Sequence, residues 1–249
     1  LALAQVNPCV GDLAGNLDRV LAGARDAHAA GARLVAFPEM VLTGYPVEDL
    51  ALRPSFQAAS RQALGSLAAR LVEEELGSLV VVVGYLDVIA DGHDRLGRPR
   101  GGPQNAAAVV TGGRVVARYA KHHLPNYGVF DEFRYFVPGS STTVVRVDGI
   151  DVAIAICEDL WQDGGPVAQV RDTGAGLLVV INGSPYERNK DDVRLALCSR
   201  RAQEAGAALA YVNMVGGQDE LVFDGASFAV GSDGALVARA PQFDEALLV

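Results

Sequence analysis

Residues 152–161 constrain the fold of this chain more strongly than any other stretch of its sequence. Residues 152–156 are small or branched apolar residues, a pattern typical of a buried strand, and they run directly into Cys157, Glu158 and Asp159. Other strand patterns along the chain are also apolar on both faces, and such strands need cover on both sides. The sequence therefore predicts sheets buried between other layers, with a potential nucleophile at the end of one strand.

Amphipathic segments and tight turns alternate with these strands. Asp12 and Pro54 are favourable helix starts, and Gly31 is a favourable helix end. Hairpin turns are predicted at 112–113, 148–149 and 232–234. The sequence predicts helices at 13–30, 54–76, 164–174 and 190–205, a polar loop at 90–102, and strands at 1–7, 33–37, 79–89, 106–111, 114–121, 142–147, 150–156, 177–182, 208–213, 227–230 and 235–238. We expect one α/β domain, with two mixed sheets packed together and helices outside.

Composition excludes several classes of protein. Half of the 249 residues are hydrophobic and 20 % are charged, which excludes a disordered chain. The net charge of −9, without a Lys/Arg cluster, argues against nucleic acid or a membrane as partner. Three cysteines without a CxxC motif argue against disulfides or a metal site, and with no signal peptide or spanning run they favour a cytoplasmic protein. The high apolar content favours a homo-oligomer.

Three predicted strands end in residues that can do chemistry: Glu39, Lys121 and Cys157. Because strand ends at one edge of a sheet gather in space, we expect a carboxylate, an amine and a thiol to converge. The carboxylate can take the proton of the thiol, whose ordinary pKa is about 8.5. The ammonium, with the backbone N–H after the cysteine, can hold the oxyanion that forms when a thiolate attacks an amide. The combination predicts amide hydrolysis.

Each of these residues also has a structural interpretation. Cys157 can complete a buried strand, since free cysteine is among the most buried residue types. Lys121 can be a solvated strand end, and Glu39 can cap a loop. Several other side chains that could take part in catalysis or binding are better interpreted as core, loop or surface residues: Cys9, Cys198, His28, His122, His123 and Trp161.

At the three strand ends the chain resembles a known family. Residues 37–39, Lys121 and residues 157–159 resemble the Glu–Lys–Cys triad of the nitrilase, or carbon–nitrogen hydrolase, superfamily, and the resemblance covers residues 1–240. It implies a four-layer α-β-β-α sandwich, in agreement with the pattern of strands and helices. It also implies roles: Glu39 as general base, Lys121 as oxyanion stabiliser, Cys157 as nucleophile, and Glu132 as a second glutamate that orients the lysine.

Four longer stretches narrow the resemblance to one subfamily. Residues 42–46, 121–132, 182–186 and 215–225 resemble the glutaminase domain of glutamine-dependent NAD synthetases. The resemblance implies that L-glutamine is hydrolysed to glutamate through a thioester. It implies further that the ammonia passes to a synthetase domain, in the same chain or in a separate one, which uses ATP to convert deamido-NAD to NAD.

The subfamily's substrate-binding positions also fall on residues of this chain. Glutamine's α-amino acid end would be held by Tyr127, Ser184 and Lys190, with Tyr45 and Glu158 lining the same pocket. A zwitterionic substrate needs a cation for its carboxylate and acceptors for its ammonium. Arg188 is the alternative to Lys190 as that cation, and Lys190 is preferred although either would serve.

The chain departs from complete synthetases in one respect. It has no glycine- and serine-rich loop that opens a helix, which an ATP-binding domain would need. We therefore expect residues 1–249 to be a carbon–nitrogen hydrolase domain that needs no cofactor, with ATP and Mg²⁺ serving a synthetase domain that was removed or is a separate chain. The apolar ends at Leu1 and Val249 also suggest one module of a longer protein. The alternatives are a stand-alone amidase of the same superfamily and an inactive docking module.

Overall fold

The computed structural model describes residues 1–89, 102–188 and 190–249, without the side chains of residues 190–192. It contains two six-stranded mixed sheets. The first sheet has the order β14-β1-β2-β3-β4-β5, with β1 Ala2–Gln5, β2 Leu34–Ala36, β3 Val80–Val88, β4 Pro103–Thr111, β5 Arg114–Ala120 and β14 Ala246–Leu248. The second has the order β13-β12-β9-β8-β7-β6, with β6 Thr143–Val147, β7 Ile150–Ile156, β8 Leu177–Asn182, β9 Ala208–Asn213, β12 Phe228–Val230 and β13 Leu236–Arg239.

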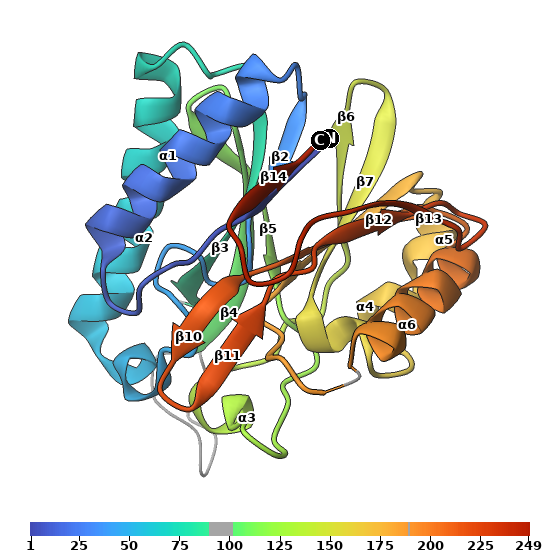
Figure 1. Cartoon of the computed structure of the whole chain (residues 1–249). Coiled ribbons are helices and arrows are strands. Elements are labelled where there is room, and N and C mark those ends of the chain that lie inside the picture. Colours follow the sequence, from blue (N-terminus) through green and yellow to red (C-terminus); the bar gives the residue numbers. More distant parts are fainter. Residues whose placement is uncertain (90–101, 189) are drawn as a thin grey trace.

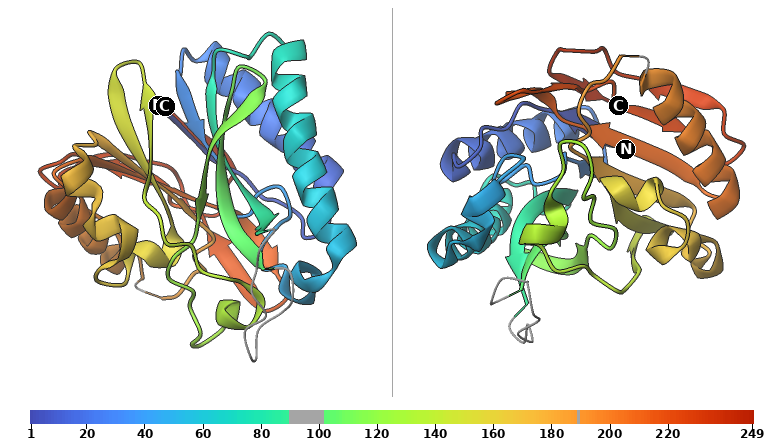
Figure 2. Two further views of the ribbon diagram at one scale, coloured as in Figure 1. Left: turned by 180° about the vertical axis from the view of Figure 1, so that it is seen from behind. Right: turned by 90° about the horizontal axis from the view of Figure 1, so that it is seen from below.

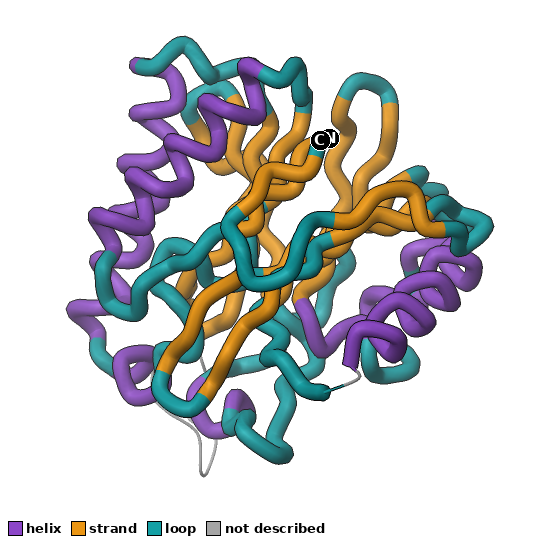
Figure 3. The backbone as a smooth tube through the Cα atoms, viewed as in Figure 1, coloured by secondary structure: helices purple, strands orange, loops and turns teal. Residues whose placement is uncertain are grey.

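Helices cover the outer face of each sheet. On the first sheet lie α1 (Leu13–Ala29) and α2 (Pro54–Glu73), and on the second α4 (Gly165–Ala168), α5 (Val170–Thr173) and α6 (Lys190–Ala205) (Figure 1). A third apolar cluster, formed by side chains of both sheets, fills the space between them. Figure 3 shows the strands enclosed by helices, and Figure 2 shows the same layers from behind and from below. The four-layer α-β-β-α sandwich predicted from the sequence is confirmed.

Parallel pairing at the centre of each sheet brings particular strand ends together. In the first sheet β1, β2 and β3 are parallel, and in the second β7, β8 and β9 are parallel. Apolar strands that are largely buried occupy these positions, as parallel strands covered by helices should. Glu39 follows β2, Lys121 follows β5, and Cys157 follows β7, so each of these three candidate residues lies just beyond a strand.

Shorter elements surround these strand ends. They are η1 (Glu48–Leu52), α3 (Glu132–Tyr135), η2 (Cys157–Leu160) and a two-stranded ribbon of β10 (Val215–Gln218) and β11 (Leu221–Asp224). A fourth apolar cluster lies beneath them and includes Met40, Tyr45, Phe136, Met214 and Phe223. The loops that carry the candidate site therefore have a core of their own.

Most predicted elements are confirmed; the structure adds α3, η1, η2 and the ribbon of β10 and β11, which were not predicted, and it differs from the prediction at three further places. The helix predicted at 164–174 is present but interrupted at Gln169, which separates α4 from α5. At the interruption the bonds from Gln169 N–H to Pro166 and from Asp172 N–H to Gln169 join residues three apart. β4 begins at Pro103 instead of residue 106. The last strand, β14, was not predicted, because its pairing with β1 joins the two ends of the chain.

Two further findings bear on the sequence analysis. The loop predicted at 90–102 lies outside the described residues except for Gly102. Within the described part of the chain, none of the helices has the length and apolar character that crossing a bilayer requires.

Candidate active site

Glu39 lies directly after the short strand β2, in a fully buried position. Phe37 N–H still bonds to Val82 of β3 at 2.9 Å, and Met40 then turns the chain with a left-handed φ of 48°. The backbone N–H of Glu39 donates to the carbonyl of Asn182, at the end of β8, at 3.4 Å. Glu39 therefore lies where the first sheet meets the second.

Lys121 follows β5 and is 1 % exposed. Its Nζ lies 2.7 Å from Glu39 Oε1 and 2.9 Å from the carboxylate of Glu132. The Tyr45 hydroxyl donates to Glu132 Oε1 at 2.8 Å, so the second glutamate is held from both sides. A buried ammonium between two carboxylates keeps a fixed orientation, which suits it to stabilise a developing negative charge.

Cys157 lies at the junction of β7 and the short helix η2, and its side chain is buried. Its φ of 43° is a left-handed conformation that non-glycine residues rarely adopt, and such conformations cluster at functional sites. Ile156 pairs with Ile181 in the parallel strand β8, so Cys157 lies across from the end of that strand. The next residues of β8 lead to Gly183, which contacts Glu39.

The charges of the cluster act on the thiol. Burial raises the pKa of Cys157 well above its ordinary value, and the Glu39 carboxylate raises it further, while the Lys121 ammonium opposes both. The resting thiol is therefore protonated at neutral pH. Attack by the sulfur requires a base that takes this proton, and a buried carboxylate within the same cluster is such a base.

Two groups that hold Glu39 were missed by the sequence analysis. The Asn105 side-chain amide donates to Glu39 Oε1 at 2.7 Å, and the Gly183 backbone N–H donates to Oε2 at 2.7 Å. Together with Lys121, they give both oxygens of this carboxylate a fixed partner. The only sequence signals were a polar residue at the start of an apolar strand and the Asn-Gly pair after β8.

Glu132 and Lys121 shift each other's protonation. Burial raises the pKa of Glu132 to about 7; Lys121 opposes this effect and the Glu39 carboxylate adds to it. For Lys121 burial alone lowers the pKa, but the Glu132 and Glu39 carboxylates outweigh it and the pKa is raised. Two carboxylates and one ammonium share this buried space, so the cluster tends to retain a proton on a carboxylate.

The protonation of Glu132 predicts how the free energy of unfolding depends on pH. The pKa of Glu132 is about 7 in the folded protein and 4.5 for an ordinary glutamate, so between these values the folded state binds more protons than the unfolded chain. Its contribution to the free energy of unfolding therefore falls as the pH rises through this window. Glu132→Gln should remove this fall.

Urea unfolding of wild type and Glu132→Gln at about pH 5 and about pH 7.5 measures the effect. We expect the stability of the wild type, relative to the variant, to be lower at the higher pH. An equal change with pH in both proteins would contradict the shifted pKa.

The residues predicted to bind substrate lie around this cluster. The Tyr127 hydroxyl donates to Glu158 Oε2 at 2.8 Å, so these two predicted residues lie side by side. The Gln162 side-chain amide donates to Glu158 Oε1 at 2.8 Å. Ser184 is buried beside Gly183, and its backbone N–H donates to Asn213 Oδ1 at 2.9 Å. Tyr45 directs its hydroxyl at Glu132, as described above.

The two candidate cations are placed less fully. Arg188 is exposed. Lys190 is the first residue of α6, but its side chain lies outside the described part of the structure. The choice between them stays a prediction.

Gly84, in the middle of β3, allows the chain that carries Glu39 to pass close by. A Cβ at this position would lie 2.6 Å from the Pro38 carbonyl oxygen and 2.8 Å from the Glu39 carbonyl carbon, and it would also overlap Met40 N. These are backbone atoms, which cannot move aside without shifting Glu39. Gly84→Ala should therefore lower the catalytic rate by about 10²-fold, because displacements near 1 Å have effects of this size.

Gly65→Ala is the matched control. Gly65 lies within α2, a Cβ there meets no atom within 4 Å, and alanine is the better helix former. Steady-state kinetics of both variants test the prediction, with this control expected to keep wild-type rates. Wild-type activity in Gly84→Ala would mean that the position of Glu39 is not critical.

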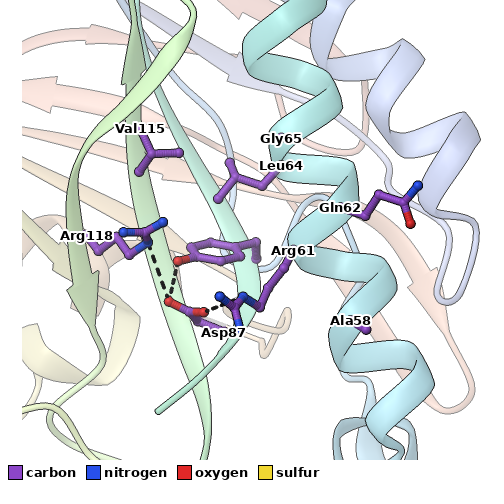
Figure 4. A pocket seen from close by; sticks show the side chains of 9 residues that line it. Ala58, Arg61, Gln62, Leu64, Gly65, Asp87, Val115 and Arg118 are labelled. Atoms are coloured by element: carbon purple, nitrogen blue, oxygen red, sulfur yellow. Dashed lines mark hydrogen bonds and ion pairs between the residues drawn. The ribbon is translucent and has the colours of Figure 1, made fainter. Parts of the chain in front are cut away.

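A hollow of about 420 Å³ lies apart from the cluster, between α2 and the strands β3 and β5. Figure 4 shows Arg61 and Arg118 approaching Asp87 from opposite sides, each with its Nε at 3.7 Å from a carboxylate oxygen. The Tyr85 hydroxyl donates to the same carboxylate at 2.5 Å. Asp87 thus occupies the space between the two cations, and none of the strand-end residues lines this hollow. Among the described residues, no group of three or more His, Cys, Asp or Glu side chains is arranged to hold a metal ion.

Several known proteins are similar to this chain in sequence and in fold. The family model for carbon-nitrogen hydrolases matches residues 1–249. The glutamine-dependent NAD(+) synthetase of Rhodobacter capsulatus is 41 % identical, over 100 % of this chain and 42 % of the relative. The structure of glutamine-dependent NAD+ synthetase from Acinetobacter baumannii is similar with a TM-score of 0.88 and 37 % identity, over 99 % of this chain and 44 % of that one.

An amidase from Nesterenkonia sp. is similar over a larger share of its own length. Its TM-score is 0.80 and its identity 27 %, over 99 % of this chain and 87 % of the amidase. The chain thus spans less than half the length of the Rhodobacter relative and most of the length of this amidase. Sequence, fold and relatives agree: this chain belongs to the carbon-nitrogen hydrolase family of enzymes.

Proposed function

We propose that this chain hydrolyses L-glutamine to glutamate and ammonia. The observation that supports the proposal most is the buried contact of 2.7 Å between Lys121 Nζ and Glu39, in a cluster whose charges act on the Cys157 thiol. The similarity to glutamine-dependent NAD synthetases favours glutamine over other amides.

In the proposed reaction Glu39 first takes the proton of Cys157. The sulfur then attacks the side-chain amide carbon of glutamine, and the negative charge passes to the amide oxygen. Lys121, together with the backbone N–H after Cys157, stabilises this oxyanion, and removing one such donor typically reduces the rate by about 10²–10³-fold. Glu132 keeps the lysine in place by its contact of 2.9 Å.

The remaining steps return the enzyme to its starting state. The carbon–nitrogen bond breaks, and the nitrogen takes the proton from Glu39 and leaves as ammonia. A thioester between Cys157 and the glutamyl group remains. Glu39 then takes a proton from water, the resulting hydroxide attacks the thioester carbon, and the thiolate leaves and is reprotonated. Every proton in this scheme passes through the same carboxylate, so the proposal requires no cofactor in this domain.

The substrate's amino acid end requires groups of both signs. Glu158, which holds the Tyr127 hydroxyl at 2.8 Å, is proposed as the acceptor for the glutamine ammonium. Ser184 and Tyr45 are proposed to line the same pocket, and Lys190, with Arg188 as the alternative, to bind the carboxylate.

The ammonia has a proposed destination. Because the chain spans less than half of its curated relatives, we propose that a synthetase domain, in the same polypeptide or in a separate one, uses ATP and Mg²⁺ to aminate deamido-NAD to NAD with this ammonia. We expect the isolated hydrolase domain to be slow, because such glutaminases tend to be activated by their synthetase partner.

A second function is favoured by one observation. The Nesterenkonia amidase matches this chain over 87 % of its own length, so a stand-alone amidase of the same fold is the alternative. The two proposals differ in substrate.

Ammonia release from L-glutamine and from simple aliphatic amides separates them. We expect kcat/KM for glutamine to exceed that for acetamide or propionamide by about 10²-fold or more, because the buried polar groups that would bind its amino acid end are left without a partner by the simple amides. Cys157→Ala provides the blank. A preference for the aliphatic amides would overturn the glutaminase proposal and support the amidase.

A further inference from the structure

A single carboxylate, that of Asp159, links the segments that carry Lys121 and Cys157. Asp159 is fully buried in η2. Its Oδ1 accepts the backbone N–H groups of His122 at 3.1 Å and His123 at 2.8 Å. Its Oδ2 accepts the Ile156 N–H at 3.1 Å and the Tyr119 hydroxyl at 2.7 Å.

These four donors flank the two reactive residues. Tyr119 and His122 lie on either side of Lys121 along the chain, and Ile156 immediately precedes Cys157. β5 belongs to the first sheet and β7 to the second, so the carboxylate joins the two sheets at the site. The contact with Ile156 also closes the turn in which Cys157 has its left-handed φ of 43°.

Resting on the proposed function, we propose that Asp159 is a positioning residue that fixes the Cys157 sulfur relative to the Lys121 ammonium. Both of its oxygens are occupied by these four donors, which belong to the segments around Lys121 and Cys157. It therefore works through the geometry of these two segments. Reactions that depend on preorganised groups lose rate steeply when those groups move by as little as 1 Å.

Asp159→Asn tests the proposal with the smallest change of shape. The amide has one oxygen and one NH₂ group, so at least one backbone N–H would face another donor and one of the segments must move. We expect kcat for glutamine hydrolysis to fall by about 10-fold or more while KM changes by less than about twofold, since the substrate-binding groups are retained. If Asp159 had a purely structural role, the variant would have a lower unfolding midpoint, and kcat would not fall selectively while KM stays constant.

Asp87→Asn is the matched control. Asp87 also accepts a tyrosine hydroxyl, from Tyr85 at 2.5 Å, and a backbone N–H, from Val88 at 2.8 Å, but it lies in the hollow beside α2. The same chemical change there should leave kcat and KM as in the wild type.

A second pair of variants covers the case in which Asp159→Asn does not fold. Tyr119→Phe removes a single hydrogen bond, and we expect kcat to fall by about threefold or more at constant KM. Tyr85→Phe, the corresponding control, should have no effect on kcat. Wild-type kcat in folded Tyr119→Phe and Asp159→Asn, or a rise in KM alone, would overturn the proposal.

The reactivity of the thiol separates this proposal from that of glutamine hydrolysis. Chloroacetamide alkylates a thiol by forming a carbon–sulfur bond while chloride leaves and the thiol proton passes to the base. We expect Asp159→Asn to slow the alkylation of Cys157, followed by mass spectrometry, by about 10-fold, and Asp87→Asn not to slow it. If the wild type releases no ammonia from glutamine, the proposed function fails, and these alkylation rates still decide the role of Asp159; equal rates in all three proteins would overturn it.

Discussion

Cys157→Ala should lower the rate of ammonia release from glutamine by at least about 10³-fold, because the sulfur is the only group proposed to form the covalent intermediate. The fold should survive, since the substitution removes only the sulfur atom of one buried side chain. Ammonia release in the presence of saturating glutamine measures the effect, and the thermal unfolding midpoint shows whether the variant is folded.

Cys198→Ala is the control for this substitution. Cys198 is also fully buried, but it lies on α6 in the apolar cluster between that helix and the second sheet. We expect it to retain the wild-type rate. Undiminished hydrolysis by Cys157→Ala would remove the thiol from the mechanism, whatever the family of the chain.

Arg194→Met should destabilise the protein by about 3–5 kcal/mol, the range observed when one partner of a buried ion pair is removed. Arg194 is 2 % exposed on α6. Its Nη1 lies 2.8 Å from both oxygens of Asp224, and its Nη2 donates to the carbonyls of Ser184 at 3.0 Å and Pro185 at 2.8 Å. Methionine fills part of the volume but leaves the Asp224 charge and two carbonyls without this partner.

Arg200→Met on the same helix is the comparison. Arg200 is 57 % exposed and lies 3.7 Å from Glu204, and surface pairs of this kind contribute little. Urea unfolding should show a change below about 0.5 kcal/mol for this variant. A loss of similar size in both variants, or none in Arg194→Met, would show that the buried pair does not hold α6 and β11 to the Ser184–Pro185 turn.

The three groups proposed to be catalytic were predictable from sequence because each follows a recognisable strand. Glu39 follows an apolar run that ends at Phe37-Pro38, Lys121 ends the strand after the Gly112-Gly113 turn, and Cys157 follows the apolar run at 152–156. The end of a strand can be predicted from the local pattern of apolar residues, so the reactive residues at these ends could be identified from the sequence. Glu132 is different: its place beside Lys121 came from the family resemblance alone.

Asn105 was not predictable because its position depends on a bulge. A hairpin with a two-residue turn at Gly112-Gly113 would pair Asn105 with Ala120. A register shift between Val109 and Val110 instead pairs Ala106 with Ala120, so Asn105 comes opposite Lys121 and its side chain reaches Glu39. One inserted residue turns every side chain beyond it on that strand to the other face of the sheet, and nothing in the apolar run indicates the insertion.

Contacts between distant segments were also beyond the sequence. Asp159 was recognised only as part of a motif, yet its four donors lie 3 to 40 residues away, on β5, the loop after Lys121 and β7. Arg194 was one polar residue on an amphipathic helix, and its carboxylate partner is 30 residues further on. Such pairs depend on how the two sheets are packed, which local patterns do not specify.

The most direct test of the account uses a glutamine analogue in which a diazoketone replaces the amide. A nucleophilic thiol at the site displaces nitrogen gas from the protonated diazo carbon and forms a stable thioether. Peptide mass spectrometry after stoichiometric inactivation then identifies the modified residue. We predict one label, on Cys157, with glutamine protecting against it; labelling of Cys9 or Cys198 instead, or full activity with no label on Cys157, would contradict the account.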